Sequence, residues 1–144
     1  MLNRALVFLD LETTGAAANV DRITEIGLIE VENGEYVREW STLVNPQMVI
    51  PPFIEALTGI SDAMVAEAPT FAAVSVELHA RLMGKLLVAH NARFDYGFLR
   101  AEFTRLDERW SEITAGFRQL GFESVERDAR GYRRGSLLVL EAAG

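Results

Sequence analysis

Apolar residues form unbroken or alternating runs in the first part of the chain. Residues 6–9 read Leu-Val-Phe-Leu, a run typical of a strand that is buried on both faces. Two more strand-like segments, 23–31 and 36–44, are separated by Asn33-Gly34, and Asn-Gly between such segments strongly favours a β-hairpin. The pattern therefore predicts that the second and third strands form an antiparallel pair beside the first.

Helical signals dominate the middle of the chain. Pro52 and Ser61 are placed to begin two short helices within a long irregular connection. Thr70 is placed to cap a longer helix with a regular apolar stripe, and residues 86–89 follow as a short buried strand. A strand, a helix and another strand in this order predict a parallel neighbour and a right-handed crossover.

The last part of the chain has a less regular pattern. Apolar positions over 110–120 predict one more amphipathic helix, which Gly121 would end. Residues 122–126 and 136–140 read as two short strands. These elements would form an atypical tail.

The pattern as a whole indicates an α/β fold. A helix is predicted over 93–105, with Asn91 placed to cap it. We expect a mixed sheet, with three antiparallel strands plus parallel strands, flanked by helices. The expected organisation is a domain over 1–106 and a helix-strand-strand tail over 107–144.

Composition sets limits on the possible functions. The 144 residues have the length of one domain, and 49% of them are hydrophobic, enough for a sizeable core. The chain has no cysteine, so any metal must be held by oxygen or imidazole ligands. The formal net charge of -7 argues against a broad basic surface for polyanions, although an acidic site that binds cations reverses the local sign. No segment approaches membrane-spanning length, so a cytoplasmic protein without a membrane partner is expected.

Two carboxylates follow the first apolar run. Asp10 and Glu12 are two residues apart, so the period of a strand places both on one side. Two like charges held there are costly unless a cation lies between them or one proton is retained. An ordinary strand end that enters a polar turn is the alternative interpretation.

A third carboxylate lies in the helix predicted over 93–105. Asp95 precedes Leu99 by one helical turn, which aligns it with the apolar stripe that must face the sheet. A salt bridge to an arginine would explain such a residue, and so would a metal ion. Asp10, Glu12 and Asp95 are oxygen ligands that suit Mg²⁺ or Mn²⁺, a set typical of two-metal phosphoryl chemistry.

Several short segments together resemble a known family. The first motif of the DnaQ-like (DEDD) 3′-5′ exonucleases is similar to residues 10–15 (DLETTG) with 21–27 (DRITEIG), and the second motif is similar to residues 88–95 (VAHNARFD). Residues 57–60 (LTGI) match the region between the two motifs. This family includes the proofreading epsilon subunit of bacterial DNA polymerase III. The resemblance implies an RNase H-like fold, Mg²⁺ or Mn²⁺ as cofactor, a single-stranded or frayed 3′ end of DNA as substrate, and a DNA polymerase as partner.

The resemblance also implies a role for each matching residue. Asp10, Glu12 and Asp95 would be the catalytic metal ligands. The residues that would bind the terminal nucleotide are Leu11, Thr13, Thr14, Gly15, Leu57, Asn91 and Phe94. Because such a site binds the backbone and a frayed end, low sequence specificity is expected.

One motif of the family has no counterpart in the sequence. The fourth carboxylate and the general base normally come from a His-x-x-x-x-Asp motif on a late helix. The only histidines are His79, expected at the surface, and His90, which belongs to the second motif and is expected to pack or to form hydrogen bonds. Asp107 and Asp128 do not lie in a matching context. Loss of a general base costs roughly 10²-fold to 10⁴-fold in rate, so a weak or inactive enzyme is expected.

Two other hypotheses remain open at this point. The chain could be a non-catalytic module that binds nucleic acid or a metal ion and derives from such a nuclease. It could also be a 3′-5′ exoribonuclease, because ribonucleases share these motifs. Binding of single-stranded DNA without cleavage would distinguish the binding module from a DNA exonuclease. Competition between matched DNA and RNA oligonucleotides would distinguish the exoribonuclease.

Overall fold

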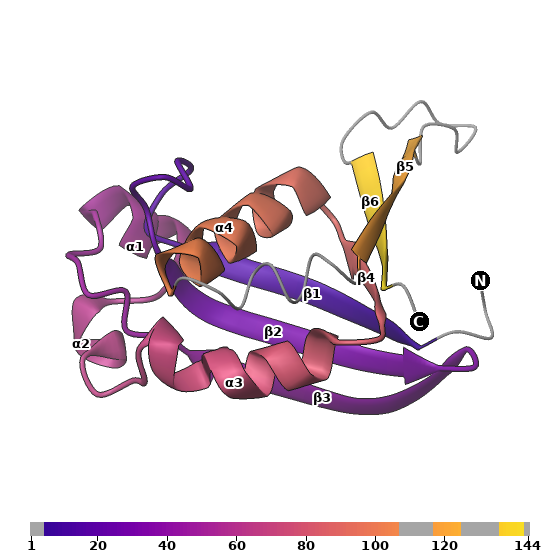
Figure 1. Ribbon diagram of the computed structural model, residues 1–144. Helices are drawn as coiled ribbons and strands as arrows, with labels where there is room; N and C mark the ends of the chain where they lie inside the picture. The colour runs from indigo at the N-terminus through magenta and orange to yellow at the C-terminus, as the bar shows by residue number, and fades with distance from the viewer. Residues whose placement is uncertain (1–4, 107–116, 125–135, 143–144) are drawn as a thin grey trace.

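Three long antiparallel strands form one half of the sheet. The computed structural model describes residues 5–106, 117–124 and 136–142. The first strands are β1 (Leu6–Thr13), β2 (Ile23–Glu32) and β3 (Glu35–Leu43). β1 pairs with β2 and β2 pairs with β3, both in antiparallel register (Figure 1). Asn33 and Gly34 both have positive φ angles, 53° and 77°, as a tight hairpin turn requires, and the predicted hairpin is confirmed.

Three helices and a fourth strand follow. They are α1 (Pro52–Thr58), α2 (Asp62–Val65), α3 (Phe71–Leu82) and β4 (Leu86–Ala89). Ser61 and Thr70 are N-caps, since their hydroxyls accept hydrogen bonds from backbone N–H groups one turn into α2 and α3. β4 pairs with β1 in parallel. Both predicted caps and the predicted parallel neighbour are therefore confirmed.

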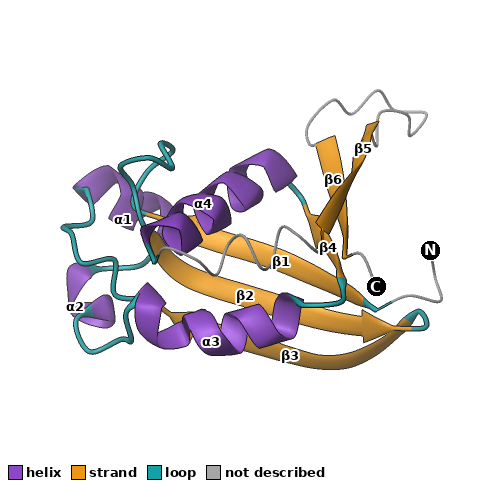
Figure 2. Ribbon diagram, in the orientation of Figure 1, coloured by secondary structure: helices purple, strands orange, loops and turns teal. Residues whose placement is uncertain are grey.

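The two longer helices pack on the same face of the sheet. The last helix, α4 (Ala92–Arg105), follows β4, and Figure 2 shows it on the same side of β1 to β3 as α3. The rings of Phe71 from α3 and Phe103 from α4 meet edge to face, with centroids 5.0 Å apart. The core beneath them includes Val7, Leu9, Leu11, Ile26, Leu28, Val74, Leu78, Phe98 and Leu99. None of the helices in the described ranges combines the length and the apolar character that crossing a membrane requires.

Two further strands extend the sheet beyond β4. They are β5 (Phe117–Ser124) and β6 (Ser136–Ala142), and the strand order is β3-β2-β1-β4-β6-β5. β6 pairs with β4, and β5 pairs with β6, in both cases antiparallel. The mixed sheet expected from the sequence is confirmed, with β1 and β4 as the parallel pair among the described strands.

The prediction of a helix over 110–120 is wrong for the last residues of that range. Residues 117–120 belong to β5, and residues 110–116 lie outside the described part of the chain. A short apolar run can satisfy both periodicities, and here the backbone groups of β5 find their partners on β6. The two predicted strands overlap β5 and β6. The predicted domain boundary after residue 106 stays a prediction.

We predict that Phe103→Ala lowers the free energy of unfolding by about 3–5 kcal/mol, because it removes a fully buried ring and leaves a cavity beside Phe71. Urea denaturation followed by circular dichroism measures this change. Phe53→Ala is the matched control: Phe53 is 71% exposed on α1, and its effect should stay within about 0.5 kcal/mol. Equal effects of the two substitutions would contradict the described core.

Candidate active site

Side chains along β1 alternate between the core and the opposite face of the sheet. Val7, Leu9 and Leu11 are at most 5% exposed and belong to the core. Asp10 and Glu12 are the more accessible residues that alternate with them. Both carboxylates therefore lie on the face that α3 and α4 do not cover, as the period of the strand predicts.

Asp95 reaches the end of β1 from the first turn of α4. The last residue of β4, Ala89, pairs with Leu9, so in the described part of the chain no strand pairs with this edge of β1 beyond Leu9. The Asp95 carboxylate accepts a hydrogen bond from the Leu11 N–H there, and Asp95 is 5% exposed. Among the ion pairs that join described residues, none includes Asp95. The alternative of an arginine salt bridge is therefore not supported.

The three carboxylates influence one another electrostatically. Burial, reinforced by the negative charges of Asp10 and Glu12, raises the pKa of Asp95 to about 7, although backbone hydrogen bonds act in the opposite direction. The pKa of Glu12 is also raised, first by burial and then by the charges of Asp10 and Glu25. We refer to Asp10, Glu12 and Asp95 as the acidic site. This site is short of positive charge.

The donor chemistry of the acidic site suits a hard divalent cation. All its ligands would be carboxylate oxygens, which Mg²⁺ and Mn²⁺ prefer, and a cation would offset the repulsion among them. Within the described ranges, however, no three side chains of histidine, aspartate or glutamate are grouped closely enough to bind a metal ion together. Mg²⁺ commonly uses one or two carboxylates and completes its coordination with water and substrate phosphates. It is therefore the donor chemistry of the acidic site, and not a preformed coordination geometry, that fits such an ion.

The turn after β1 is held by side-chain and backbone hydrogen bonds. The Thr14 hydroxyl donates to Asp21 Oδ1 (3.1 Å) and accepts from the Arg22 N–H (3.0 Å), while the Thr14 N–H donates to the Arg22 carbonyl oxygen (2.8 Å). The Thr13 hydroxyl donates to the Gly15 carbonyl oxygen (2.5 Å). A Cβ at Gly15 would collide with the Asp21 carboxylate, so a larger residue there would displace Asp21 from its hydrogen bonds to Thr14 and Ala17. Asp21 and Arg22, which the sequence marks only as part of a motif, thus hold the turn in place.

The remaining residues with a predicted nucleotide-binding role differ in their surroundings. Leu57 is 76% exposed on α1. Phe94 is partly buried, and its ring centroid lies 4.8 Å from that of Phe98. The side chain of Leu11 is buried in the core, so only its backbone could face a ligand. Asn91 is exposed and occupies the N-cap position of α4, as predicted, but its side chain makes no capping hydrogen bond.

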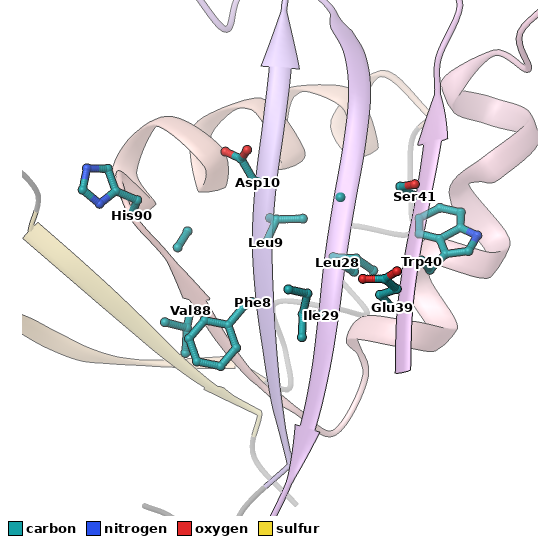
Figure 3. A pocket seen from close by; sticks show the side chains of 12 residues that line it. Phe8, Leu9, Asp10, Leu28, Ile29, Glu39, Trp40, Ser41, Val88 and His90 are labelled. Atoms are coloured by element: carbon teal, nitrogen blue, oxygen red, sulfur yellow. The ribbon is translucent and has the colours of Figure 1, made fainter. Parts of the chain in front are cut away.

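A cavity of about 750 Å³ lies on the face of the sheet that carries Asp10. Strands β1 to β4 and the residue after β4 line it, and in Figure 3 Asp10 and His90 lie toward one end while Phe8 and Val88 lie toward the other. Phe8 and Ile29 are each 42% exposed. An apolar surface therefore leads to a carboxylate of the acidic site. The sequence signal for this cavity was the alternation along β1, which places the side chains of Phe8 and Asp10 on the same face of the sheet.

The two histidines lie in different surroundings. His90 is exposed and lines the cavity beside β4, because it follows the last residue of that strand. This position does not support packing in the core, and the other predicted role, a hydrogen bond, stays a prediction. His79 is partly buried on α3, since it lies next to the fully buried Leu78, and its predicted surface position was wrong. Asp107 and Asp128 lie outside the described residues.

A buried ion-pair network connects α4 to the loop after β1. Glu102 is 1% exposed, and its carboxylate accepts hydrogen bonds from Arg22 Nε (2.6 Å) and Nη2 (3.1 Å) and from Arg105 Nη1 (2.8 Å). Arg105 Nη2 also donates to the carbonyl oxygens of Ala18 (3.0 Å) and Asp21 (3.4 Å). The sequence predictions missed this network. Its one signal is an acidic residue between the apolar positions of α4.

Sequence comparison places the chain among nucleases. A sequence model of the exonuclease family RNase_T matches residues 7–133, and the chain belongs to this family of DnaQ-like exonucleases. One relative is a Mycobacterium tuberculosis protein with the provisional name bifunctional exonuclease/endonuclease, 49% identical over 112 residues, and another is the 3′-5′ exonuclease DinG of Bacillus subtilis, 42% identical over 103 residues. These matches cover 74% and 71% of this chain but 17% and 11% of the relatives. The chain therefore spans less than a fifth of their length.

Comparison with solved structures supports the fold. Exonuclease I superposes with a TM-score of 0.68 over 75% of this chain and 26% of the exonuclease I chain, at 20% sequence identity. A likeness at this identity shows the fold alone. The expected RNase H-like α/β fold is confirmed.

We predict that Asp95 makes the metal-free protein less stable as the pH rises from about 4 to about 8. The raised pKa of Asp95 means that the folded state holds this proton more tightly than the unfolded chain does. The stabilising contribution is fully present below the usual aspartate pKa of 3.8 and is lost as the pH passes through about 7. A shift of about three units corresponds to a loss of up to about 4 kcal/mol, and the raised pKa of Glu12 acts in the same direction.

Urea denaturation of the wild type and Asp95→Asn in EDTA, at a series of pH values, measures this contribution. Asp95→Asn should become the more stable of the two proteins as the pH approaches 8. Glu77→Gln, at an exposed position of α3, is the control and should follow the wild type at every pH. A constant difference between wild type and Asp95→Asn across the series would contradict the prediction.

Proposed function

We propose that this chain is a metal-dependent nuclease domain that hydrolyses phosphodiester bonds at the 3′ ends of DNA. The observation that carries the proposal is the buried Asp95 carboxylate, which is electrostatically coupled to Asp10 and Glu12. A repulsive group of this kind gains stability from a divalent cation. The likeness to DinG and the family resemblance support the 3′-5′ direction.

The proposed site divides binding between the acidic site and the turn after β1. Asp10, Glu12 and Asp95 would hold Mg²⁺ or Mn²⁺, which when bound offsets charge on the phosphate and lowers the pKa of an attacking water. Backbone groups of residues 13–15 bind the terminal nucleotide, and the hydrogen bonds among Thr14, Asp21 and Arg22 keep this turn in one conformation. Leu57 packs against the terminal base. Asn91 and Phe94 shape the pocket around it.

The absence of the late histidine motif limits the proposed rate. No histidine follows residue 90 in the sequence. A positioned general base contributes roughly 10²-fold to 10⁴-fold, so we propose slow hydrolysis unless another chain or segment supplies the base. Since the relatives are much longer, a DNA polymerase partner and a cytoplasmic location are further proposals that rest on the family resemblance.

We predict that the protein releases nucleoside monophosphates from single-stranded DNA in Mn²⁺, and that Asp10→Ala reduces this release to background. Asp10 is exposed, so its substitution should leave the fold intact. Glu32→Gln, at an exposed position before the β2–β3 hairpin turn, is the matched control and should keep the wild-type rate. Chromatography of the products measures the release. The same background rate from wild type and Asp10→Ala would refute the proposed activity.

A non-catalytic binding module is the second candidate, because the late histidine motif is missing. Titration with single-stranded DNA in Ca²⁺ tests it. Binding in Ca²⁺, together with no cleavage in Mg²⁺ or Mn²⁺, would favour the module over the nuclease. Competition between matched DNA and RNA oligonucleotides tests the exoribonuclease hypothesis, which predicts a preference for RNA.

A further inference from the structure

Glu102 is an acidic side chain in an almost fully buried position. A buried carboxylate is tolerated only when charged groups replace its water. The fork of Arg22 binds both oxygens of Glu102, at 2.6 Å and 3.1 Å, and Arg105 adds a third hydrogen bond at 2.8 Å. A bidentate contact fixes the direction as well as the distance between the two groups. Glu102 therefore holds Arg22 against α4 in one geometry.

Arg22 continues this contact into the turn after β1. Its backbone N–H and its carbonyl oxygen both form hydrogen bonds with Thr14, at 3.0 Å and 2.8 Å. Thr14 is 1% exposed and lies two residues after Glu12. Hydrogen bonds thus connect Glu102 to the end of β1, where two carboxylates of the acidic site are located.

The same helix carries the third carboxylate. Glu102 lies seven residues after Asp95, which is two turns or about 10 Å along α4. Both residues are buried, and Phe98 and Leu99 between them belong to the core. Because a helix of this length is stiff, a contact that fixes Glu102 also fixes Asp95 relative to Glu12. It opposes the repulsion that would otherwise separate α4 from the end of β1.

We propose that Glu102 is a positioning residue for the acidic site. Through Arg22 and Arg105 it keeps α4, which carries Asp95, docked against the end of β1 that carries Asp10 and Glu12, so its loss weakens binding of a divalent cation at the acidic site. This inference rests on the proposed metal site. It assigns a role to a residue that touches neither metal nor substrate.

Isothermal titration of the full chain with Mn²⁺ tests the inference. Glu102→Gln is nearly isosteric and should raise the Mn²⁺ dissociation constant by about 10-fold to 100-fold, the usual effect of losing a residue that orients a ligand. Glu30→Gln is the matched control. Glu30 is 3% exposed and pairs with Arg81 and Lys85, but it lies opposite Val7 at the other end of β1. It should cost stability and leave the dissociation constant unchanged.

The possible outcomes separate the inference from the proposed function. Wild-type Mn²⁺ affinity in a folded Glu102→Gln protein, or equal losses in Glu102→Gln and Glu30→Gln, would overturn the positioning role alone. Failure of the wild type to bind more Mn²⁺ than Asp10→Asn would overturn the proposed metal site and this inference with it.

A second variant, Arg105→Gln, tests the positioning role if Glu102→Gln does not fold. Arg105 has a side chain that is 29% exposed, and Arg105→Gln leaves the contact between Arg22 and Glu102 in place. The positioning role predicts a several-fold weaker affinity for Mn²⁺ in Arg105→Gln, and Arg105→Lys should recover part of it. Unchanged affinity in Arg105→Gln would count against the inference.

Discussion

Repulsion among Asp10, Glu12 and Asp95 is the constraint on which the rest of the site depends. Two of these carboxylates share one face of β1, and the third approaches because β4 ends early and leaves the Leu11 N–H for Asp95. Backbone hydrogen bonds offset only part of the cost, since the pKa of Asp95 is still raised to about 7. A divalent cation or a retained proton would offset the remaining repulsion among the carboxylates. The pH and the metal concentration determine which of the two is bound.

Comparison with the other buried acids supports a special role for this site. Three acidic residues are buried in the described part of the chain: Glu30, Asp95 and Glu102. Glu30 and Glu102 each pair with basic side chains that connect a helix to the sheet or to its loops. Asp95 instead accepts hydrogen bonds from backbone N–H groups and is repelled by the charges of Asp10 and Glu12. The first arrangement holds a fold together, whereas the second requires a ligand or a proton.

Local signals predicted most of the elements, but not the contacts between distant parts of the chain. Asn33-Gly34 and Thr70 act on neighbours within a few residues, so the sequence alone sufficed for the hairpin and the cap. The strand at 117–120 was missed because its conformation depends on pairing with β6. Arg22 and Glu102 are 80 positions apart, and no periodicity marks such a pair. The accessible positions of Asp10 and Glu12 on β1 and the buried position of Asp95 on α4 were predictable, since each is marked by its place on its own element, while their role as a metal site stays a prediction.

Anomalous diffraction from crystals of the full chain soaked in Mn²⁺ near pH 8 tests the central claim most directly. A cation-dependent site predicts a manganese peak in contact with the carboxylate oxygens of Asp10 and of at least one of Glu12 and Asp95. Manganese bound only elsewhere, or an Asp95 carboxylate paired with a guanidinium in the crystal, would contradict it.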